Sequence, residues 1–160
     1  MGTSNDLDPE VSVPESHELS TQQCEALLRM GMGMVGRVAF STPAGPHMVP
    51  VNYTVVDDAI VVRTSPYSLL GTHGRNTVVA FEVDGFDHEL ERGWSVQARG
   101  RMEVVTAHRE ITRIREVADP SPWADGVRAL YLRLRWTDLS GRQLGATWNP
   151  VPDVPVTPAS

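Results

Sequence analysis

Apolar and polar residues alternate along residues 91–105, ERGWSVQARGRMEVV. One side of this alternation contains Trp94, Val96, Ala98, Gly100, Met102 and Val104, and the other contains Ser95, Gln97, Arg99, Arg101 and Glu103. A period of two predicts a β-strand rather than a helix. The small residues Ala98 and Gly100 leave one face thin, so we expect another element to pack closely there. The polar face either meets water, as in many antiparallel sheets, or lines a ligand site.

The same reasoning predicts five further strands. Three of them lie at residues 36–42, 77–86 and 129–136. The other two lie within residues 47–64 and are joined by a turn at Asp57 and Asp58. Pro50 has no backbone N–H, so it belongs at an edge or where strand pairing is interrupted. The short connections favour antiparallel pairing, and six such strands closing into a small barrel would remove most exposed edges. The expected fold is therefore mainly β with short peripheral helices.

Helices are predicted at 19–30, 65–76 and 106–119. The first begins with a capping box formed by Ser20 and Gln23, and the second begins at Ser65 as N-cap. The third has one apolar face, made of Ile111, Ile114, Val117 and Ala118. The sequence GMGMVG at 31–36 matches GxGxxG, but a helix precedes it and a strand follows, whereas a dinucleotide fingerprint requires the opposite order. We interpret it as a helix stop.

Both ends of the chain differ from its middle. Residues 1–16 are polar, acidic and interrupted by proline, which is typical of a mobile arm, whereas 17–145 carries the periodic segments. Residues 146–160 contain Pro150, Pro152, Pro155 and Pro158, which favour an extended tail. The tail could instead lie across a partner subunit. One domain with two arms is the expected organisation.

Composition narrows the class of protein. The 160 residues are 41% hydrophobic and 21% charged, as in a globular domain, and the formal net charge of −6 disfavours nucleic acid as a partner. No apolar run approaches the roughly 18 residues of a membrane span, and the first thirty residues lack a signal-peptide pattern, so we expect a cytoplasmic protein without a membrane partner. Cys24 is the only cysteine and lies in a helical pattern, where a small core residue is favoured over a reactive thiol.

Few residues suggest chemistry directly. The five histidines show no metal-ligand spacing, and no GxSxG nucleophile motif is present, so neither a metal site nor a hydrolase is supported. The stretch VVRTSPYS is more informative. Arg63 ends a strand, Thr64 and Ser65 offer hydroxyls, and the free N–H groups of a following helix would complete an anion site. An ordinary helix cap beside a solvated Arg63 is the alternative.

The order of short motifs resembles a known family. GRVAF, VPVNY, VVRT with a short helix, VAFEVDGFD, GWSVQARGRMEVV and LSGRQL resemble the FMN-binding split barrels of the pyridoxamine 5'-phosphate oxidase-like superfamily, in particular the small bacterial branch that includes nitroimidazole-resistance-type proteins. The resemblance extends from about His17 to Leu144. It implies a six-stranded antiparallel Greek-key split barrel and a homodimer with FMN in the cleft between subunits.

The resemblance also implies site residues. The strand at Val49, Pro50, Val51 and Asn52 would follow the edge of the flavin ring. Arg63, Thr64, Ser65 and Ser68 would hold the phosphate. Trp94 would approach the cofactor, reaching it across the dimer, and Arg142 is similar to a basic residue that approaches the cleft. Gln97 and Arg99 would then lie at or near the subunit interface, the alternative being that Arg99 and Arg101 are merely solvated.

One position departs from the family pattern. The family commonly has a lysine in the short helix where this chain has Leu69. The loss of a charge-assisted contact would cost about 1.5–3 kcal/mol, or roughly tenfold to hundredfold in affinity. His73 or Arg75 could supply the missing charge.

Two functions fit these observations. The first is a flavin-dependent oxidoreductase acting on a small molecule, in which the flavin carries the redox chemistry and no catalytic residue is nominated. The second, which Leu69 favours, is a non-catalytic module that binds FMN or the deazaflavin F420, or a dimeric barrel that has lost its cofactor.

Overall fold

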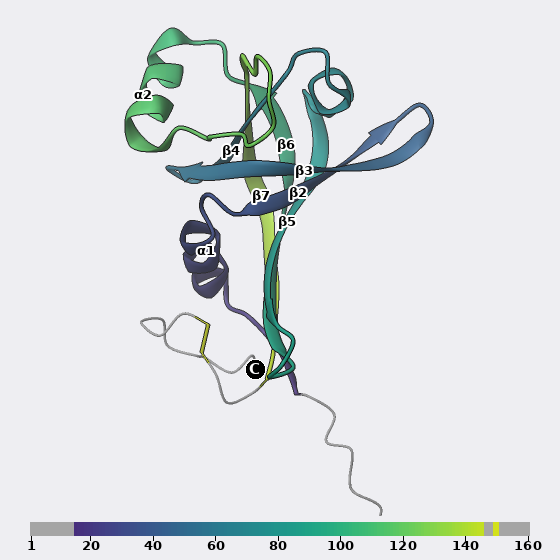
Figure 1. The fold of residues 1–160 in the computed structure, drawn as a ribbon, viewed down its shortest axis with the longest axis vertical. Helices are drawn as coiled ribbons and strands as arrows, with labels where there is room; N and C mark the ends of the chain where they lie inside the picture. The colour runs from purple at the N-terminus through teal and green to yellow at the C-terminus, as the bar shows by residue number, and fades with distance from the viewer. Residues whose placement is uncertain (1–14, 146–148, 151–160) are drawn as a thin grey trace, which may run out of the picture.

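The computed structural model describes residues 15–145 and 149–150. It contains seven strands and three helical segments, and Figure 1 shows their arrangement. The strands are β1 (Ser16–Glu18), β2 (Val35–Thr42), β3 (Gly45–Val56), β4 (Ala59–Thr64), β5 (Thr77–Asp87), β6 (Arg92–Val104) and β7 (Leu130–Leu144). The helices are α1 (Thr21–Met30) and α2 (His108–Ala118), with one π-helical turn, η1 (Leu70–Gly74). The expected arm and tail lie largely outside the described residues.

Six strands form a closed ring, and all their pairings are antiparallel. The order is β7-β4-β3-β2-β5-β6, and β6 pairs with β7 to close the ring. The predicted mainly-β fold with a six-stranded split barrel is thereby confirmed. The seventh strand, β1, was not predicted. It adds to the outer end of β7 through Ser16–Glu18, one residue ahead of the expected domain boundary.

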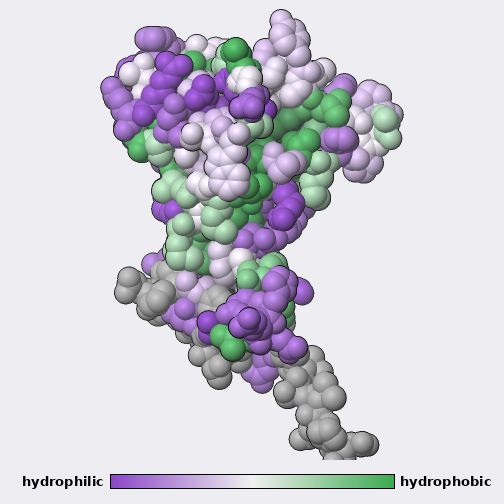
Figure 2. Space-filling model, viewed as in Figure 1, coloured by the Kyte–Doolittle hydropathy of each residue, from purple (hydrophilic) through white to green (hydrophobic). Residues whose placement is uncertain are grey.

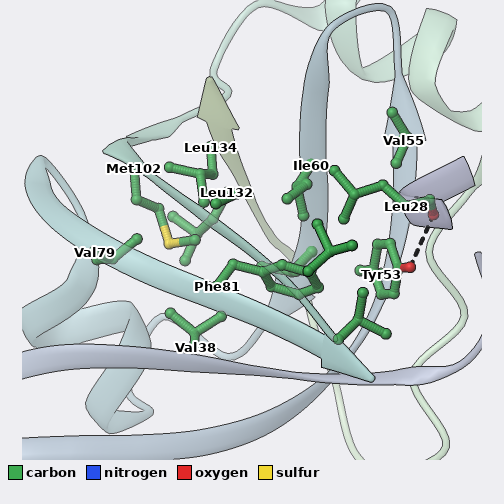
Figure 3. Close-up of a cluster of buried hydrophobic side chains, with 14 of the residues drawn as sticks. Leu28, Val38, Tyr53, Val55, Ile60, Val79, Phe81, Met102, Leu132 and Leu134 are labelled. Carbon is green, nitrogen blue, oxygen red and sulfur yellow. Dashed lines mark hydrogen bonds between the residues drawn. The ribbon is translucent and has the colours of Figure 1, made fainter. Parts of the chain in front are cut away.

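The interior of the ring holds the main core. Tyr53 and Phe81 pack edge to face at its centre, with ring centroids 4.8 Å apart. The hydroxyl of Tyr53 donates a hydrogen bond to the backbone carbonyl of Leu28 at 2.8 Å, which joins β3 to α1 (Figure 3). Burial raises the pKa of Tyr53, so this phenol stays a neutral donor. The hydrogen bond satisfies a polar group that the core would otherwise leave unpaired.

Helix α1 covers this core. Its N-terminus has the predicted capping box: the Ser20 hydroxyl accepts from the Gln23 backbone N–H, and the Gln23 side chain accepts from the Ser20 N–H. Cys24 is fully buried, as predicted, and the helix stops at Gly31. The GMGMVG segment is therefore a helix end leading into β2.

Strands β5, β6 and β7 extend beyond the barrel as a long arm toward β1 (Figure 1). The predicted alternation of β6 is confirmed, since its apolar side is buried from Trp94 to Met102. At Gly100 an added Cβ would lie 2.1 Å from the Arg135 carbonyl oxygen of β7, so only glycine fits. The register between β6 and β7 shifts at this point, between Arg99 and Gly100. The close neighbour expected from Gly100 is thus the final strand.

Three details differ from the predictions. Strand β7 continues to Leu144, eight residues beyond the predicted end, because its second half pairs with both β6 and β1. Val117 is 54% exposed, because α2 turns only Ile111 and Ile114 toward the sheet. The segment after β4 makes turns before the helical residues begin at Leu70, so Ser65 does not cap a helix there.

Strand β3 leaves β4 partway along its length. The two strands pair only between Tyr53–Val56 and Ala59–Val62, so residues 49–52 and 63–64 diverge. Pro50 lies in this divergent part, paired with Arg37 of β2 on its other side. The position of Pro50 where pairing is interrupted agrees with the prediction. The divergence opens the wall of the barrel.

Candidate functional site

A cavity of about 330 Å³ lies where β3 and β4 diverge. Its volume falls at the lower end of the roughly 300–1,000 Å³ found for small-molecule sites. Three segments line it: β2 with β3, the end of β4 with the turn after it, and the loop that precedes β7. The lining residues are Val35, Val49, Pro50, Val51, Asn52, Arg63, Thr64, Ser68, Leu69, Leu70, Pro122, Trp123, Ala124 and Arg128.

Most of the predicted site residues meet here. Val49, Pro50, Val51, Asn52, Arg63, Thr64 and Ser68 all line this one cavity. They come from two strands and a turn that the sequence alone could not place side by side. Ser65, Trp94 and Arg142 are not among the lining residues.

Asn52 has a polar atom without a partner. Its Oδ1 accepts a hydrogen bond from the Trp123 backbone N–H at 3.0 Å, which fixes the orientation of the amide. The Nδ2 atom is buried and has no hydrogen-bond partner among the described residues. A buried donor left in this state costs about 1–3 kcal/mol unless a ligand or water accepts from it. Asn52, which lines the cavity, therefore has one unused donor, suited to a carbonyl oxygen or ring nitrogen.

Arg63 is held by three contacts. Its Nη1 lies 3.3 Å from Asp119 Oδ2, its Nε donates to the Arg128 carbonyl at 3.2 Å, and its guanidinium lies 5.0 Å from the centre of the Tyr131 ring. The Arg63 side chain is 25% exposed. The alternative of a merely solvated Arg63 is therefore wrong. The expected positive charge is present at the cavity wall, but a carboxylate partly neutralises it.

The turn after β4 is organised by its own side chains. The Ser68 hydroxyl donates to the Ser65 carbonyl at 2.8 Å and accepts from the Gly71 N–H at 2.9 Å. Since the proton of Ser68 is used, Thr64 Oγ1 must be the donor in its 2.8 Å contact with Ser68 Oγ. Ser65 Oγ accepts from the Tyr67 N–H. Both lining hydroxyls, those of Thr64 and Ser68, thus donate within the turn.

The predicted row of free helix N–H groups is wrong in its details. Four of these N–H groups are bonded within the turn. Those of Tyr67 and Ser68 donate to the hydroxyl and the carbonyl of Ser65, in that order. Those of Gly71 and Thr72 donate to the hydroxyl and the carbonyl of Ser68, in that order. A five-residue π-helical turn starting at Leu70 replaces the expected α-helix. Gly71 explains part of this, because a Cβ there would lie 2.3 Å from the Ser65 carbonyl oxygen. These four N–H groups are therefore not free to bind an anion.

The loop before β7 contributes residues that sequence analysis did not nominate. Trp123 is 74% exposed at the edge of the cavity, and Arg128 lies in its wall. Arg128 donates from Nε to the Ala124 carbonyl at 3.1 Å and from Nη2 to the Asp125 carbonyl at 3.4 Å. A tryptophan and an arginine together in a proline-containing loop, PSPWADGVRA, are the signal that could have directed attention to this segment.

Leu69 lines the cavity as an apolar residue. Neither His73 nor Arg75 is among the lining residues, although both follow in the same segment. The described cation that shares this cavity with Arg63 is Arg128. A second positive charge therefore comes from the loop before β7 and not from the segment that contains Leu69.

Trp94 and Arg142 lie elsewhere in the chain. Trp94 is 6% exposed and belongs to the hydrophobic core. Arg142 faces a second, more open cavity of about 460 Å³, shared with Glu18, Glu82 and Gln97 among others. Strand pairing places Trp94 opposite Gln143, next to Arg142. Within one subunit these two residues do not share the cavity that contains Arg63.

The described residues contain no group of three or more His, Cys, Asp or Glu side chains placed to bind a metal ion. In the same part of the chain, every helix is too short or too polar to cross a bilayer.

Comparison with known proteins identifies a family that matches most of this chain. The profile of the family described as pyridoxamine 5'-phosphate oxidase matches residues 20–143. An uncharacterised protein of Mycobacterium tuberculosis, Rv0080, is 32% identical over 90 residues, which are 53% of this chain and 59% of that protein. The chain therefore matches less than two thirds of the length of that curated relative.

Solved structures with the same fold include two proteins that are named as FAD-binding. An FAD-binding protein from Mycobacterium smegmatis is 25% identical, with a TM-score of 0.67 over 80% of this chain and 98% of that one. An FAD-binding protein from Mesorhizobium loti is 21% identical, with a TM-score of 0.66 over 83% of this chain and 99% of the other. The second match concerns the fold alone.

Proposed function

Because this chain belongs to the pyridoxamine 5'-phosphate oxidase family, we propose that the cavity between β3 and β4 binds a flavin, and that the protein is a flavin-dependent oxidoreductase of a small molecule. The observation that carries the proposal is the composition of this cavity. Its lining combines apolar side chains with two arginines, two hydroxyls and Asn52, whose Nδ2 has no partner among the described residues. An apolar pocket with a few convergent polar groups is the common form of a cofactor site.

The residues present suit the parts of a flavin nucleotide. Val49, Pro50 and Val51 offer a flat apolar edge to the ring system, and Asn52 Nδ2 offers a hydrogen bond to a ring acceptor. Arg63 brings a positive charge to the cavity, and the hydroxyls of Thr64 and Ser68 would have to exchange their hydrogen bonds within the turn to donate to a phosphate. Trp123 lies at the rim, where an aromatic side chain can cover a ring.

When bound, the flavin supplies the hydride or electron transfer. The chain's own residues then bind, orient and shield. The described lining of the cavity offers no carboxylate, histidine, cysteine or lysine that would act as a proton donor or acceptor. We therefore nominate no catalytic residue and assign the protein the tasks of holding the phosphate, donating from Asn52 and excluding water.

FMN is the flavin we propose, because one cluster of cationic and hydroxyl groups fits one phosphate. FAD is the direct competitor, since the relatives named above are called FAD-binding. A non-catalytic module that binds a flavin or a deazaflavin is a second candidate. The observation that favours it is the Arg63–Asp119 ion pair beside the apolar Leu69, which weakens the positive potential at the site.

We also propose that two copies of the chain form the complete site. Arg142 is separated from the cavity within one subunit, so it can contribute only from a second copy, whereas Trp94 is buried in the core of its own subunit. Figure 2 shows a band of apolar surface across the middle of one face, between more polar ends. Such bands are typical of surfaces that another protein covers. Light scattering of the purified protein should give twice the mass of one chain.

The decisive experiment is a visible spectrum followed by titration. The protein purified without added cofactor, and again after incubation with FMN, FAD or a deazaflavin, should show a bound flavin spectrum with FMN preferred. Addition of NADH or NADPH with an electron acceptor then distinguishes the candidates. Steady turnover supports the oxidoreductase, stable binding without turnover supports the module, and a colourless protein that ignores all three cofactors contradicts flavin binding.

A further inference from the structure

The proposed flavin site is short of positive charge. Leu69 is apolar, and the charge of Arg63 is partly neutralised by Asp119 at 3.3 Å. The hydroxyl protons of Thr64 and Ser68 are already donated within the turn after β4. A phosphate entering this end of the cavity would therefore meet few free donors from the residues that the family resemblance nominates.

Arg128 differs from Arg63 in the charge of its partners. Its two hydrogen bonds go to the neutral carbonyls of Ala124 and Asp125. Among the described residues, no carboxylate forms an ion pair with it. A guanidinium has five N–H donors, and these two contacts use two of them. Arg128 thus brings a nearly full positive charge and spare donors to the cavity wall.

The loop holds Arg128 in place from both sides of the cavity. The Arg128 carbonyl accepts from Arg63 Nε at 3.2 Å, which ties its backbone to β4. The Trp123 N–H donates to Asn52 Oδ1 at 3.0 Å, which ties the start of the loop to β3. The bond from Arg128 to the Ala124 carbonyl closes the turn between these anchors. A side chain anchored in this way loses little entropy on binding, which favours recognition.

We propose that Arg128 is the principal phosphate-binding cation of this chain and supplies the charge that Leu69 does not. This inference rests on the proposed function, since it presumes that a flavin nucleotide occupies the cavity. The two arginines then have different tasks. Arg63 orients the loop through the Arg128 carbonyl, and Arg128 meets the phosphate with a charge-assisted hydrogen bond.

The test compares FMN with riboflavin, which has the same ring and no phosphate. Arg128→Gln removes the charge but keeps an amide that can still donate to the Ala124 carbonyl, so the loop should keep its shape. We expect FMN affinity to fall at least tenfold and riboflavin affinity to change less than twofold. Arg128→Lys, which keeps the charge, should recover most of the FMN affinity.

Arg101→Gln is the matched control. Arg101 also donates to a backbone carbonyl, that of Asn76, but does not line the cavity. Its FMN affinity should equal that of the parent. A rescue variant adds a second test: Leu69→Lys in the Arg128→Gln background should restore FMN affinity at least fivefold, because both positions line the same cavity.

The outcomes separate the two proposals. If the parent binds FMN and Arg128→Gln binds it equally well, or loses riboflavin to the same extent, Arg128 does not meet the phosphate, although flavin binding stands. If the parent binds neither FMN nor riboflavin, the proposed function fails and this inference fails with it. A selective loss of FMN that Leu69→Lys repairs is the result expected here.

Discussion

Arg63 and Asp119 form an ion pair on the wall of the cavity between β3 and β4, with Nη1 3.3 Å from Oδ2. The other oxygen of Asp119 accepts a hydrogen bond from the Tyr131 hydroxyl at 3.0 Å, and Arg115 Nε donates to that same hydroxyl at 3.1 Å. Both guanidinium groups contact the Tyr131 ring, that of Arg63 at 5.0 Å and that of Arg115 at 5.6 Å from its centre. This network orients Arg63, but it also places a negative charge beside a proposed anion site.

Asp119→Asn should strengthen the binding of FMN. The amide keeps an oxygen that can accept from Tyr131 but loses the oxygen that accepts from Arg63. Arg63 should stay in position through its remaining contacts with the Arg128 carbonyl and the Tyr131 ring, while the repelling charge is lost. Since the Asp119 side chain is 36% exposed, the gain is limited to that of a screened charge pair, up to about 1 kcal/mol or roughly fivefold in affinity. Titration with FMN and with riboflavin checks this, because riboflavin affinity should not change. An equal gain for both ligands would mean that Asp119 acts on the ring or on the fold.

Arg63→Ala should weaken FMN binding about threefold to tenfold while the protein stays folded. The effect is smaller than the loss of a free charge-assisted contact, because Asp119 already shares the charge. Fluorescence titration gives the affinity, and urea unfolding reports the fold. Arg115→Ala is the matched control, since Arg115 packs on the same Tyr131 ring but does not line the cavity. If Arg115→Ala weakened FMN binding as much, the effect of Arg63 would be structural.

The strands were predictable because their periodicity is strong. The alternation in β6 predicts that every second residue lies in the core, and these residues are buried in the structure. The turn between β3 and β4 falls at Asp57, whose φ of 53° is one that aspartate tolerates better than most residues. The pairing of β6 with β7 could not be derived from either strand alone. It depends on contacts between residues some forty positions apart, for which periodicity carries no signal.

The candidate site was predictable only in part. The segments at 49–52 and 63–68 carried recognisable motifs, and the structure brings most of their residues into one cavity. The loop at 119–129 has no hydrophobic period and two prolines, so nothing in its pattern suggested that it returns to the same cavity. Its position depends on single hydrogen bonds, from Arg63 to the Arg128 carbonyl and from the Trp123 N–H to Asn52. Contacts of this kind leave no trace in the spacing of residues.

Trp123→Ala should weaken the binding of FMN and riboflavin to the same extent. The indole lies at the cavity rim, so it would contact the ring, which the two ligands share. Aromatic contacts contribute about 0.5–1.5 kcal/mol beyond area burial, which corresponds to roughly twofold to tenfold in affinity. The emission of Trp123, which is 74% exposed in the free protein, should also become less accessible to iodide when flavin binds.

Tyr67→Ala provides the control for Trp123. Tyr67 is 93% exposed in the turn after β4 and does not line the cavity, so its removal should leave both affinities unchanged. Trp123→Phe keeps an aromatic ring and should retain most of the affinity. A loss of FMN without a loss of riboflavin would assign Trp123 to the phosphate end of the site and contradict its placement over the ring.

Cys24 should make stability fall between about pH 9 and pH 11. Burial raises the pKa of its thiol from 9.0 to about 11 in the folded protein. The unfolded chain therefore begins to lose this proton near pH 9, whereas the folded chain holds it until about pH 11. Since the unfolded state binds fewer protons in this window, the free energy of unfolding decreases there by up to about 3 kcal/mol, and below pH 9 the group has no effect.

Cys24→Ala isolates this contribution, because its cavity cost is the same at every pH. Urea unfolding of both proteins under reducing conditions should give a constant difference up to about pH 9, and the parent should then lose stability faster than the variant up to pH 11. Tyr53, whose pKa is also raised by burial, adds a fall of its own at high pH, but it is present in both proteins and cancels in the difference. A difference that stays constant through pH 11 would mean that the thiolate is accommodated in the folded state, and that Cys24 is less sealed from water than its burial on the inner face of α1 indicates.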